Sequence, residues 1–270
     1  MVSTGSILNL LIELIKNMSV LIVLAYILTR TKIYAEIIQS KEAASLKQKV
    51  CLTLICGIFA IYGTLSGIKI GGAIANVRDL GPAIAGLIGG PFAGLAAGLI
   101  GGIHRYFVGG FTYLSSSAST VVAGLAGGMI YRYRKGKFIS VAGGAAFMAL
   151  MEIFHMGLLL AIERPFDQAM LLVENIGLPM IFTDALGMSI FAFIVRNFLN
   201  EKETQRTKEL IESELSIARD IQMSIVPKIF PASPELPESI LPSTVKTKTS
   251  FFFACRTSIT GLLIICCQEI

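Results

Sequence analysis

Charged residues are scarce in this sequence of 270 residues. They make up 15% of the chain, whereas hydrophobic residues make up 54%, and an ordinary soluble domain carries about 25% charged residues. This shortage argues against a soluble globular fold and against a disordered chain. The formal net charge is +5. No basic patch interleaved with aromatic residues accompanies that charge, so we expect no nucleic-acid partner. A basic excess is instead typical of membrane proteins, whose cytoplasmic loops face anionic lipid.

Tryptophan is absent, and there are only two histidines and five cysteines. Cys51 and Cys56 lie in an apolar segment, and the other three cysteines lie near the C-terminus. Their spacing matches neither a disulfide framework nor a zinc site. The sequence therefore predicts no metal site and no cofactor.

Long apolar runs are abundant. A bilayer span needs about 20 mostly apolar residues, and six stretches qualify, at 6–29, 50–68, 82–103, 112–131, 138–162 and 171–195. The first stretch has no basic residue before Lys16 and no small-residue cleavage site after it, so we interpret it as a retained span and not as a signal peptide. The predicted fold is all-α, a polytopic membrane helix bundle with about six spans.

The positions of lysine and arginine predict how the chain crosses the membrane. Three basic segments, at 30–49, 132–137 and 196–208, are predicted to be cytoplasmic. Three predicted spans lie between the first two basic segments, and three full crossings would put those segments on opposite sides of the membrane. Both can be cytoplasmic only if the segment 82–111 does not make a single full crossing. Pro91 follows Gly89-Gly90 near its middle and removes a backbone donor. We therefore predict that this segment is broken or re-entrant near Gly90, with both of its ends on the outer side, although two short spans would give the same topology.

Glycines recur every four residues in the same segment, at Gly86, Gly90, Gly94 and Gly98. Small residues at this spacing let helix backbones approach closely in lipid. The pattern predicts tight helix packing, and bare backbone of this kind would also suit the wall of a ligand cavity.

Ionisable and hydroxyl side chains at membrane depth are costly, so each is a candidate functional residue. With the segment broken, five of them lie on the outer side: Arg78, His104, Arg105, Ser116 and Ser119. Arginine presents a planar fork to carboxylates, and helix N-termini favour negative charge. We therefore predict a pocket for a small anion, most naturally a carboxylate. The alternatives are a local ion pair between Arg78 and Asp79, interfacial snorkelling of His104 and Arg105, and serines that only cap a helix.

A second polar group is predicted within the membrane. Glu152 and His155 are three residues apart and share a helix face, and Asp184 lies in the last predicted span. Such a cluster could sense pH or relay protons. The alternative is a structural polar contact that ties two spans together.

An ordered series of motifs resembles a known family. It consists of Asn76-Val77-Arg78, the run GLIGGPFAGLAAGLIGGIHRYFVGG at 86–110, the hydroxyl cluster 116–120, Met151-Glu152 and Leu178-Pro179-Met180. Over roughly residues 6–198 the chain resembles the membrane receptor domain of LytS/YehU-type bacterial sensors. The resemblance implies a multi-pass protein of the bacterial plasma membrane that passes a signal to a cytoplasmic histidine kinase, with cell-envelope regulation as one role.

The segment that follows resembles a different module. Residues 214–227, ELSIARDIQMSIVP, are similar to the linker that opens RsbU/SpoIIE-type metal-dependent Ser/Thr phosphatases. No kinase motif follows the last span, and no aspartate follows Asp220. We therefore expect no catalytic residues and no enzyme activity in this chain. Residues 228–270 are interpreted as a truncated or frameshifted tail without order.

Residues 199–226 predict a helix with one apolar stripe, formed by Ile211, Leu215, Ala218, Ile221 (or Gln222) and Ile225. A stripe this narrow favours a parallel coiled-coil homodimer, and the alternative is a solvated linker. The predicted organisation is a sensor domain at 1–198, a cytoplasmic signalling helix at 199–227 and the tail.

These observations predict a membrane receptor that senses a small anionic ligand or the state of the envelope. It would relay the signal to a cytoplasmic effector of kinase or phosphatase type. The alternative function is a small-solute transporter or a substrate-capture subunit, because transporters also use broken helices at binding sites.

Overall fold

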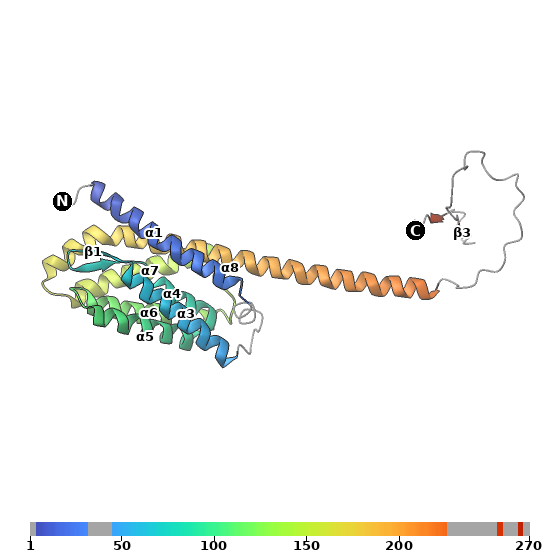
Figure 1. Cartoon of the computed structure of the whole chain (residues 1–270), viewed down its shortest axis with the longest axis horizontal. Coiled ribbons are helices and arrows are strands. Elements are labelled where there is room, and N and C mark those ends of the chain that lie inside the picture. The colour runs from blue at the N-terminus through green and yellow to red at the C-terminus, as the bar shows by residue number, and fades with distance from the viewer. Residues whose placement is uncertain (1–3, 32–44, 226–252, 256–263, 267–270) are drawn as a thin grey trace, which may run out of the picture. The chain divides into compact units, whose positions relative to one another are not determined.

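The computed structural model describes residues 4–31, 45–225, 253–255 and 264–266 (Figure 1). The chain divides into two units, Met1–Leu210 and Ile211–Ile270. The first unit contains α1 (Thr4–Thr29), α3 (Leu46–Leu65), α4 (Leu80–Gly89), α5 (Pro91–Val108), α6 (Tyr113–Tyr133), α7 (Val141–Ile162) and most of α8 (Phe166–Ile225). The predicted all-α membrane fold is confirmed.

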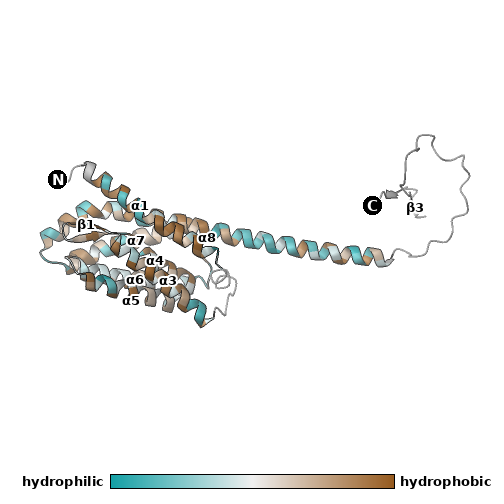
Figure 2. Ribbon diagram, viewed as in Figure 1, coloured by the Kyte–Doolittle hydropathy of each residue, from teal (hydrophilic) through white to brown (hydrophobic). Residues whose placement is uncertain are grey.

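Four helices in the described part of the chain are long and apolar enough to cross a membrane: Ile7–Thr29, Leu46–Leu65, Val141–Ile162 and Phe166–Ser224. Figure 2 shows apolar residues over the helices of the first unit and hydrophilic residues along the later part of α8. Although α5 and α6 are 18 and 21 residues long, they do not reach the same apolarity, because glycine and serine replace larger apolar residues. The six stretches predicted from the sequence therefore differ in character.

The predicted break in the glycine-rich segment is present. Helix α4 ends at Gly89, Gly90 adopts a φ of 86°, and α5 begins at Pro91. With 10 residues, α4 is about 15 Å long, too short for a hydrocarbon core of about 30 Å. A Cβ atom on Gly94 would lie 2.7 Å from the Cα of Gly86, so α5 turns back along α4. The segment is a helical hairpin and not one continuous span.

Helix α6 packs against both arms of this hairpin through glycines. A Cβ atom on Gly86 or Gly94 would run into the carbonyl oxygen of Gly124, and one on Gly98 would lie 2.9 Å from the carbonyl oxygen of Thr120. The prediction of tight packing along the glycine pattern is confirmed.

Strands β1 (Ile68–Ile70) and β2 (Ala73–Ala75) form a small antiparallel hairpin that the sequence analysis did not predict. Its turn, Gly71-Gly72, has positive φ at both residues, as two-residue hairpin turns require. Three loops meet at this end of the first unit. Phe111 donates a backbone hydrogen bond to Gly72, and Gln168 donates one from its side chain to Gly71. We call this the β-hairpin end; it holds residues 69–79, 109–112 and 163–168.

Helix α8 runs from Phe166 to Ile225 with Pro179 inside it, so the last predicted span and the signalling helix are one helix. The proposed boundary at residue 198 stays a prediction. In the tail, β3 (Phe253–Cys255) pairs antiparallel with β4 (Ile264–Cys266). The rest of the predicted tail lies outside the described residues.

Candidate functional site

Buried polar side chains gather close to the β-hairpin end. Arg78 follows β2, Arg105 lies in the last turn of α5, and Ser116 and Ser119 lie in the first turns of α6. Arg78 is 1% exposed and Arg105 is 0% exposed. Snorkelling of Arg105 to an interface, one of the alternatives considered from the sequence, is therefore wrong.

Arg78 is held by α6 and by its own neighbour. Its Nε donates to Thr120 Oγ1 at 2.6 Å, and its Nη2 donates to the carbonyl oxygen of Ser116 at 3.1 Å. The Asp79 Oδ1 atom lies 3.3 Å from Nε. The Nη1 atom is buried and has no hydrogen-bond partner. The guanidinium group thus keeps one donor edge available.

Asp79 also anchors the start of α4 to α6. Its Oδ2 accepts a hydrogen bond from Ser119 Oγ at 2.9 Å, and its Oδ1 lies 2.8 Å from Thr120 Oγ1. The local ion pair of Arg78 with Asp79 is confirmed. It does not end at the helix entry, because two hydroxyl groups of α6 extend it into the bundle.

Arg105 has a different set of partners. One of its terminal nitrogens donates to the carbonyl oxygen of Gly109, and the other donates to Thr112 Oγ1 at 3.1 Å. Its Nε atom is buried without a partner. Arg105 bonds to Thr112, and Arg78 bonds to Ser116 and Thr120. These three positions are four residues apart at the start of α6, so both guanidinium groups lie along one face of that helix.

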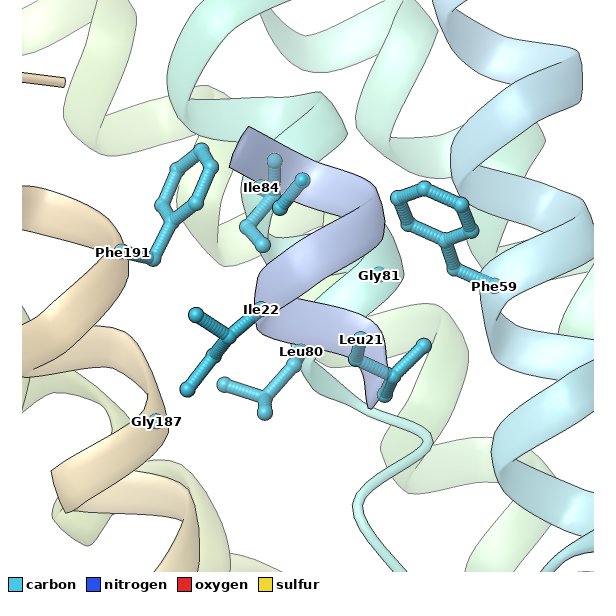
Figure 3. Close-up of a pocket in the computed structure, with 9 residues that line it drawn as sticks. Leu21, Ile22, Phe59, Leu80, Gly81, Ile84, Gly187 and Phe191 are labelled. Carbon is cyan, nitrogen blue, oxygen red and sulfur yellow. The ribbon is translucent and has the colours of Figure 1, made fainter. Parts of the chain in front are cut away.

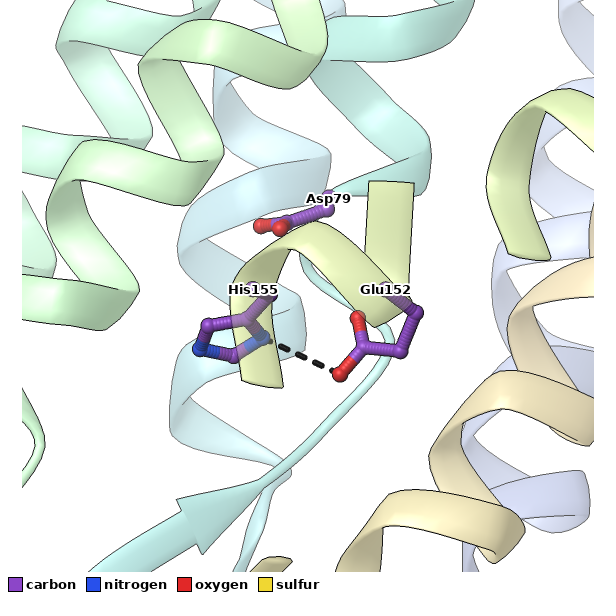
Figure 4. A group of neighbouring side chains, drawn as sticks. All are labelled: Asp79, Glu152 and His155. Atoms are coloured by element: carbon purple, nitrogen blue, oxygen red, sulfur yellow. Dashed lines mark hydrogen bonds and ion pairs between the residues drawn. The ribbon is translucent and has the colours of Figure 1, made fainter. Parts of the chain in front are cut away.

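Figure 4 shows the second polar group with Asp79, Glu152 and His155 facing one another. The Nδ1 atom of His155 lies 3.0 Å from Glu152 Oε1, and its Nε2 lies 3.2 Å from Ser116 Oγ. Asp184, the third residue of the predicted group, is buried on α8, and its Oδ1 atom has no hydrogen-bond partner. The structure therefore joins the two predicted groups of residues through the contact of Ser116, from the first group, with His155, from the second.

His104 is the predicted pocket residue that the structure does not bring to the others. It is half-buried on α5, and its Nδ1 atom has no hydrogen-bond partner. No hydrogen bond or ion pair links it to the other predicted residues within the described ranges. Its place in a pocket stays a prediction.

Three residues of the site were not among the predicted pocket residues. Thr120 contacts both Arg78 and Asp79, and its spacing of four from Ser116 was a usable signal, because residues at that spacing share a helix face. Thr112 and Glu163 carried no such signal. Glu163 follows the last residue of α7, and its Oε1 accepts a hydrogen bond from the backbone N–H of Ser115.

An apolar cavity adjoins the site (Figure 3). It is bordered by α1, α3, α4 and α8, and its lining includes Leu21, Phe59, Leu80 and Phe191. Leu80 directly follows Asp79 in the chain. No charged side chain lines this cavity, so it does not suit an anion.

Comparison with known proteins identifies the architecture. The family model described as 5TMR of 5TMR-LYT matches residues 31–198, from the end of α1 through most of the apolar part of α8. The chain belongs to the 5TMR-LYT family. The residue series at 76–180 that resembled LytS-type receptor domains is therefore confirmed, and so is the multi-pass location in the bacterial plasma membrane.

Relatives of the family are sensor proteins. The chain is 38% identical over 194 residues to the sensor histidine kinase BtsS of Escherichia coli K12, covering 69% of this chain and 34% of that protein. It is 32% identical over 219 residues to the sensor protein LytS of Bacillus subtilis, covering 74% and 37%. It is 30% identical over 219 residues to LytS of Staphylococcus epidermidis RP62A, covering 74% and 36%.

The chain thus spans about a third of the length of these relatives. No solved structure matches it. The family match and these relatives identify the chain as a membrane sensor. The resemblance of residues 214–227 to a phosphatase linker stays a prediction.

Proposed function

We propose that this 5TMR-LYT domain binds a small carboxylate between Arg78 and Arg105 and relays its binding along α8 to a cytoplasmic effector. The observation that carries this proposal is that both guanidinium groups are buried and each keeps a nitrogen without a partner, Nη1 of Arg78 and Nε of Arg105. A buried charged donor left without an acceptor costs about 1–3 kcal/mol or more. A carboxylate that accepts from both groups would offset this cost.

The surroundings favour a small ligand. The other nitrogens of both arginines are already bonded to Ser116, Thr120, Gly109 and Thr112, so the guanidinium groups are held in place before a ligand arrives. Pre-organised donors lose little side-chain entropy on binding. Two fixed, buried guanidinium groups favour a compact anion over a bulky one.

A chain of contacts leads from this pocket to α8. Ser116 on α6 contacts His155 on α7. The next residue of α7, Met156, packs on α8, since a Cβ atom on Gly177 would lie 3.7 Å from Met156 Sδ. A ligand that shifts the start of α6 would change these contacts and bias the position of α8. Small helix shifts of this kind are a known form of conformational switching. An ion pair of 3.1 Å between Arg30 and Glu201 ties residue 30, just after α1, to α8.

We propose that catalysis is supplied by an effector domain or a partner, and that residues 1–270 are not themselves an enzyme. The histidine-kinase relatives support an effector of kinase type, and the resemblance at 214–227 supports one of phosphatase type. A homodimer joined through the apolar stripe of α8 fits either. Regulation of the cell envelope is the role that we propose for the pathway.

The proposal is tested by isothermal titration of the protein in lipid nanodiscs with a panel of C2 to C4 mono- and dicarboxylates. Each lost charge-assisted hydrogen bond is worth about 1.5–3 kcal/mol, so we expect Arg78→Ala and Arg105→Ala each to weaken binding by about tenfold or more. Arg132→Ala is the matched control, because Arg132 is an exposed arginine in the last turn of α6. Affinity that is unchanged in both variants, or no carboxylate bound by the wild type, would end the proposal.

A further inference from the structure

We propose that Asp79, Glu152 and His155 form a binding site for one divalent transition-metal cation. Each of the three residues offers one ligand atom, and these atoms all lie within 4.8 Å of one another. All three side chains are buried, and Figure 4 shows them arranged around a common point, from the start of α4 and from α7. This site uses residues other than the two arginines of the proposed carboxylate pocket.

The first argument is charge. Asp79, Glu152 and Asp184 are three buried carboxyl groups of the bundle, and Arg78 pairs with one of them, Asp79, at 3.3 Å. Carboxylates within a buried site repel one another, and an uncompensated buried charge is strongly destabilising. A dication with the charge of Arg78 would balance these groups.

The second argument is an unused ligand atom. Asp184 is 1% exposed, and its Oδ1 atom has no hydrogen-bond partner. It lies on α8 and is not among the three residues whose ligand atoms lie within 4.8 Å of one another, so it could ligate an ion there only after a shift of its side chain. A buried carboxylate oxygen without a donor is rare, and a bound cation would give it a partner as a fourth ligand.

The third argument is that the candidate ligands make hydrogen bonds to surrounding residues of the kind that metal ligands usually make. The Nε2 atom of His155 lies 3.2 Å from Ser116 Oγ while its Nδ1 faces Glu152. A ligating histidine usually donates its other ring N–H to a fixed acceptor, and ligating carboxylates are themselves hydrogen-bonded. Asp79 receives hydroxyl groups from Ser119 and Thr120. When a cation binds at Nδ1, the ring proton resides on Nε2 and is donated to Ser116.

One of the ligand pairs already has a suitable spacing, and the pairs with Asp79, which lie within 4.8 Å, would close further around an ion. Ligand atoms about 2.0–2.2 Å from a tetrahedral ion lie roughly 3.3 Å apart, and Nδ1 of His155 and Oε1 of Glu152 are 3.0 Å apart. One imidazole nitrogen with carboxylate oxygens suits Zn²⁺ and Mn²⁺, whereas Mg²⁺ and Ca²⁺ prefer oxygen alone. The sequence analysis predicted no metal site because it looked for closely spaced Cys and His, whereas here Glu152 and His155 come from α7 and Asp79 comes from the start of α4.

The experiment is a titration of the protein in nanodiscs with Mn²⁺ and, separately, Zn²⁺. Mn²⁺ is included because thiolates prefer Zn²⁺, and the chain has five cysteines. We expect one Mn²⁺ per chain, and affinities at least tenfold weaker in Glu152→Gln and in His155→Ala. Ser116→Ala should weaken binding about tenfold, as outer-contact changes do. Glu174→Gln is the matched control, since Glu174 is an exposed glutamate on α8.

Two results would overturn the proposal. One is a wild type that binds neither Mn²⁺ nor Zn²⁺ saturably, which would mean that shared protons balance the carboxylates. The other is an unchanged Mn²⁺ affinity in both ligand variants. Circular dichroism shows whether each variant is folded. If Glu152→Gln or His155→Ala does not fold, Asp184→Asn is used in its place. Arg105→Ala should lose carboxylate binding and keep Mn²⁺ binding, so this proposal and the proposed function fail separately.

Discussion

Gly94 of α5 and Gly124 of α6 face each other so closely that neither position has room for a side chain. A Cβ atom on Gly94 would run into the carbonyl oxygen of Gly124, and the reverse also holds. We expect Gly94→Ala to force the two helices apart and to lower the free energy of unfolding by about 1–3 kcal/mol, as overpacking does. Thermal melting followed by circular dichroism measures this effect in a protein without tryptophan.

Gly157 on α7 provides the control for this prediction. A Cβ atom there would meet nothing within 4 Å, and alanine favours a helix over glycine by about 0.5–1 kcal/mol. Gly157→Ala should therefore melt at or above the temperature of the wild type. If Gly94→Ala behaved in the same way, the close approach of α5 and α6 would be contradicted.

The second prediction concerns the side of the membrane that the β-hairpin end faces. Val108 is 43% exposed at the end of α5. In a background without the five native cysteines, we expect Val108→Cys to react with a membrane-impermeant thiol reagent added to whole cells. The reason is that the positions of the basic loops predict both ends of the α4–α5 hairpin on the outer side.

Two exposed positions calibrate that labelling experiment. Asp167→Cys, at the β-hairpin end, should react from outside, and Lys137→Cys, in the basic loop after α6, should react only after permeabilisation. Labelling of Val108→Cys only after permeabilisation would reverse the assignment. It would place both arginines of the proposed pocket near the cytoplasmic side.

The helices and the break were predictable because their causes are local. Apolar runs set the helices, and a Gly90-Pro91 pair removes a backbone donor where the chain turns. The tight packing of α6 was predictable for the same reason, since glycine spacing is a property of one segment. The β1–β2 hairpin escaped prediction because its strands have three residues each, too few for an alternating pattern.

The polar site was only partly predictable because its contacts are between distant segments. Arg78, Glu152 and Asp184 are ionisable and therefore costly in lipid, which the sequence shows directly. The sequence does not show which partner each side chain contacts. Arg78 bonds to Thr120, 42 residues away, and Ser115 bonds to Glu163, 48 residues away. Such pairings depend on which face each helix turns inward, and that is decided by the packing of the whole bundle.

The third prediction concerns the apolar stripe of α8 in the second unit. Ile211, Leu215 and Ile221 are 50%, 64% and 54% exposed, although burial of a large apolar side chain from water is favourable by about 1.5–3 kcal/mol. Exposed apolar residues along one helix face indicate a partner helix. We expect Leu215→Asp to abolish or strongly weaken self-association of the detergent-solubilised protein, measured by light scattering coupled to size-exclusion chromatography.

Ser213 gives the matched control for the stripe. It is exposed on the same helix, but with Ile211 and Leu215 at core positions of a heptad it falls on the opposite face. Ser213→Asp adds the same charge two residues away and should leave the dimer intact. Equal loss of association in both variants would indicate a general effect of charge on α8, and equal retention would place the dimer contacts outside the stripe. Either result would contradict a coiled coil at these residues, because only a specific helix face distinguishes the two positions.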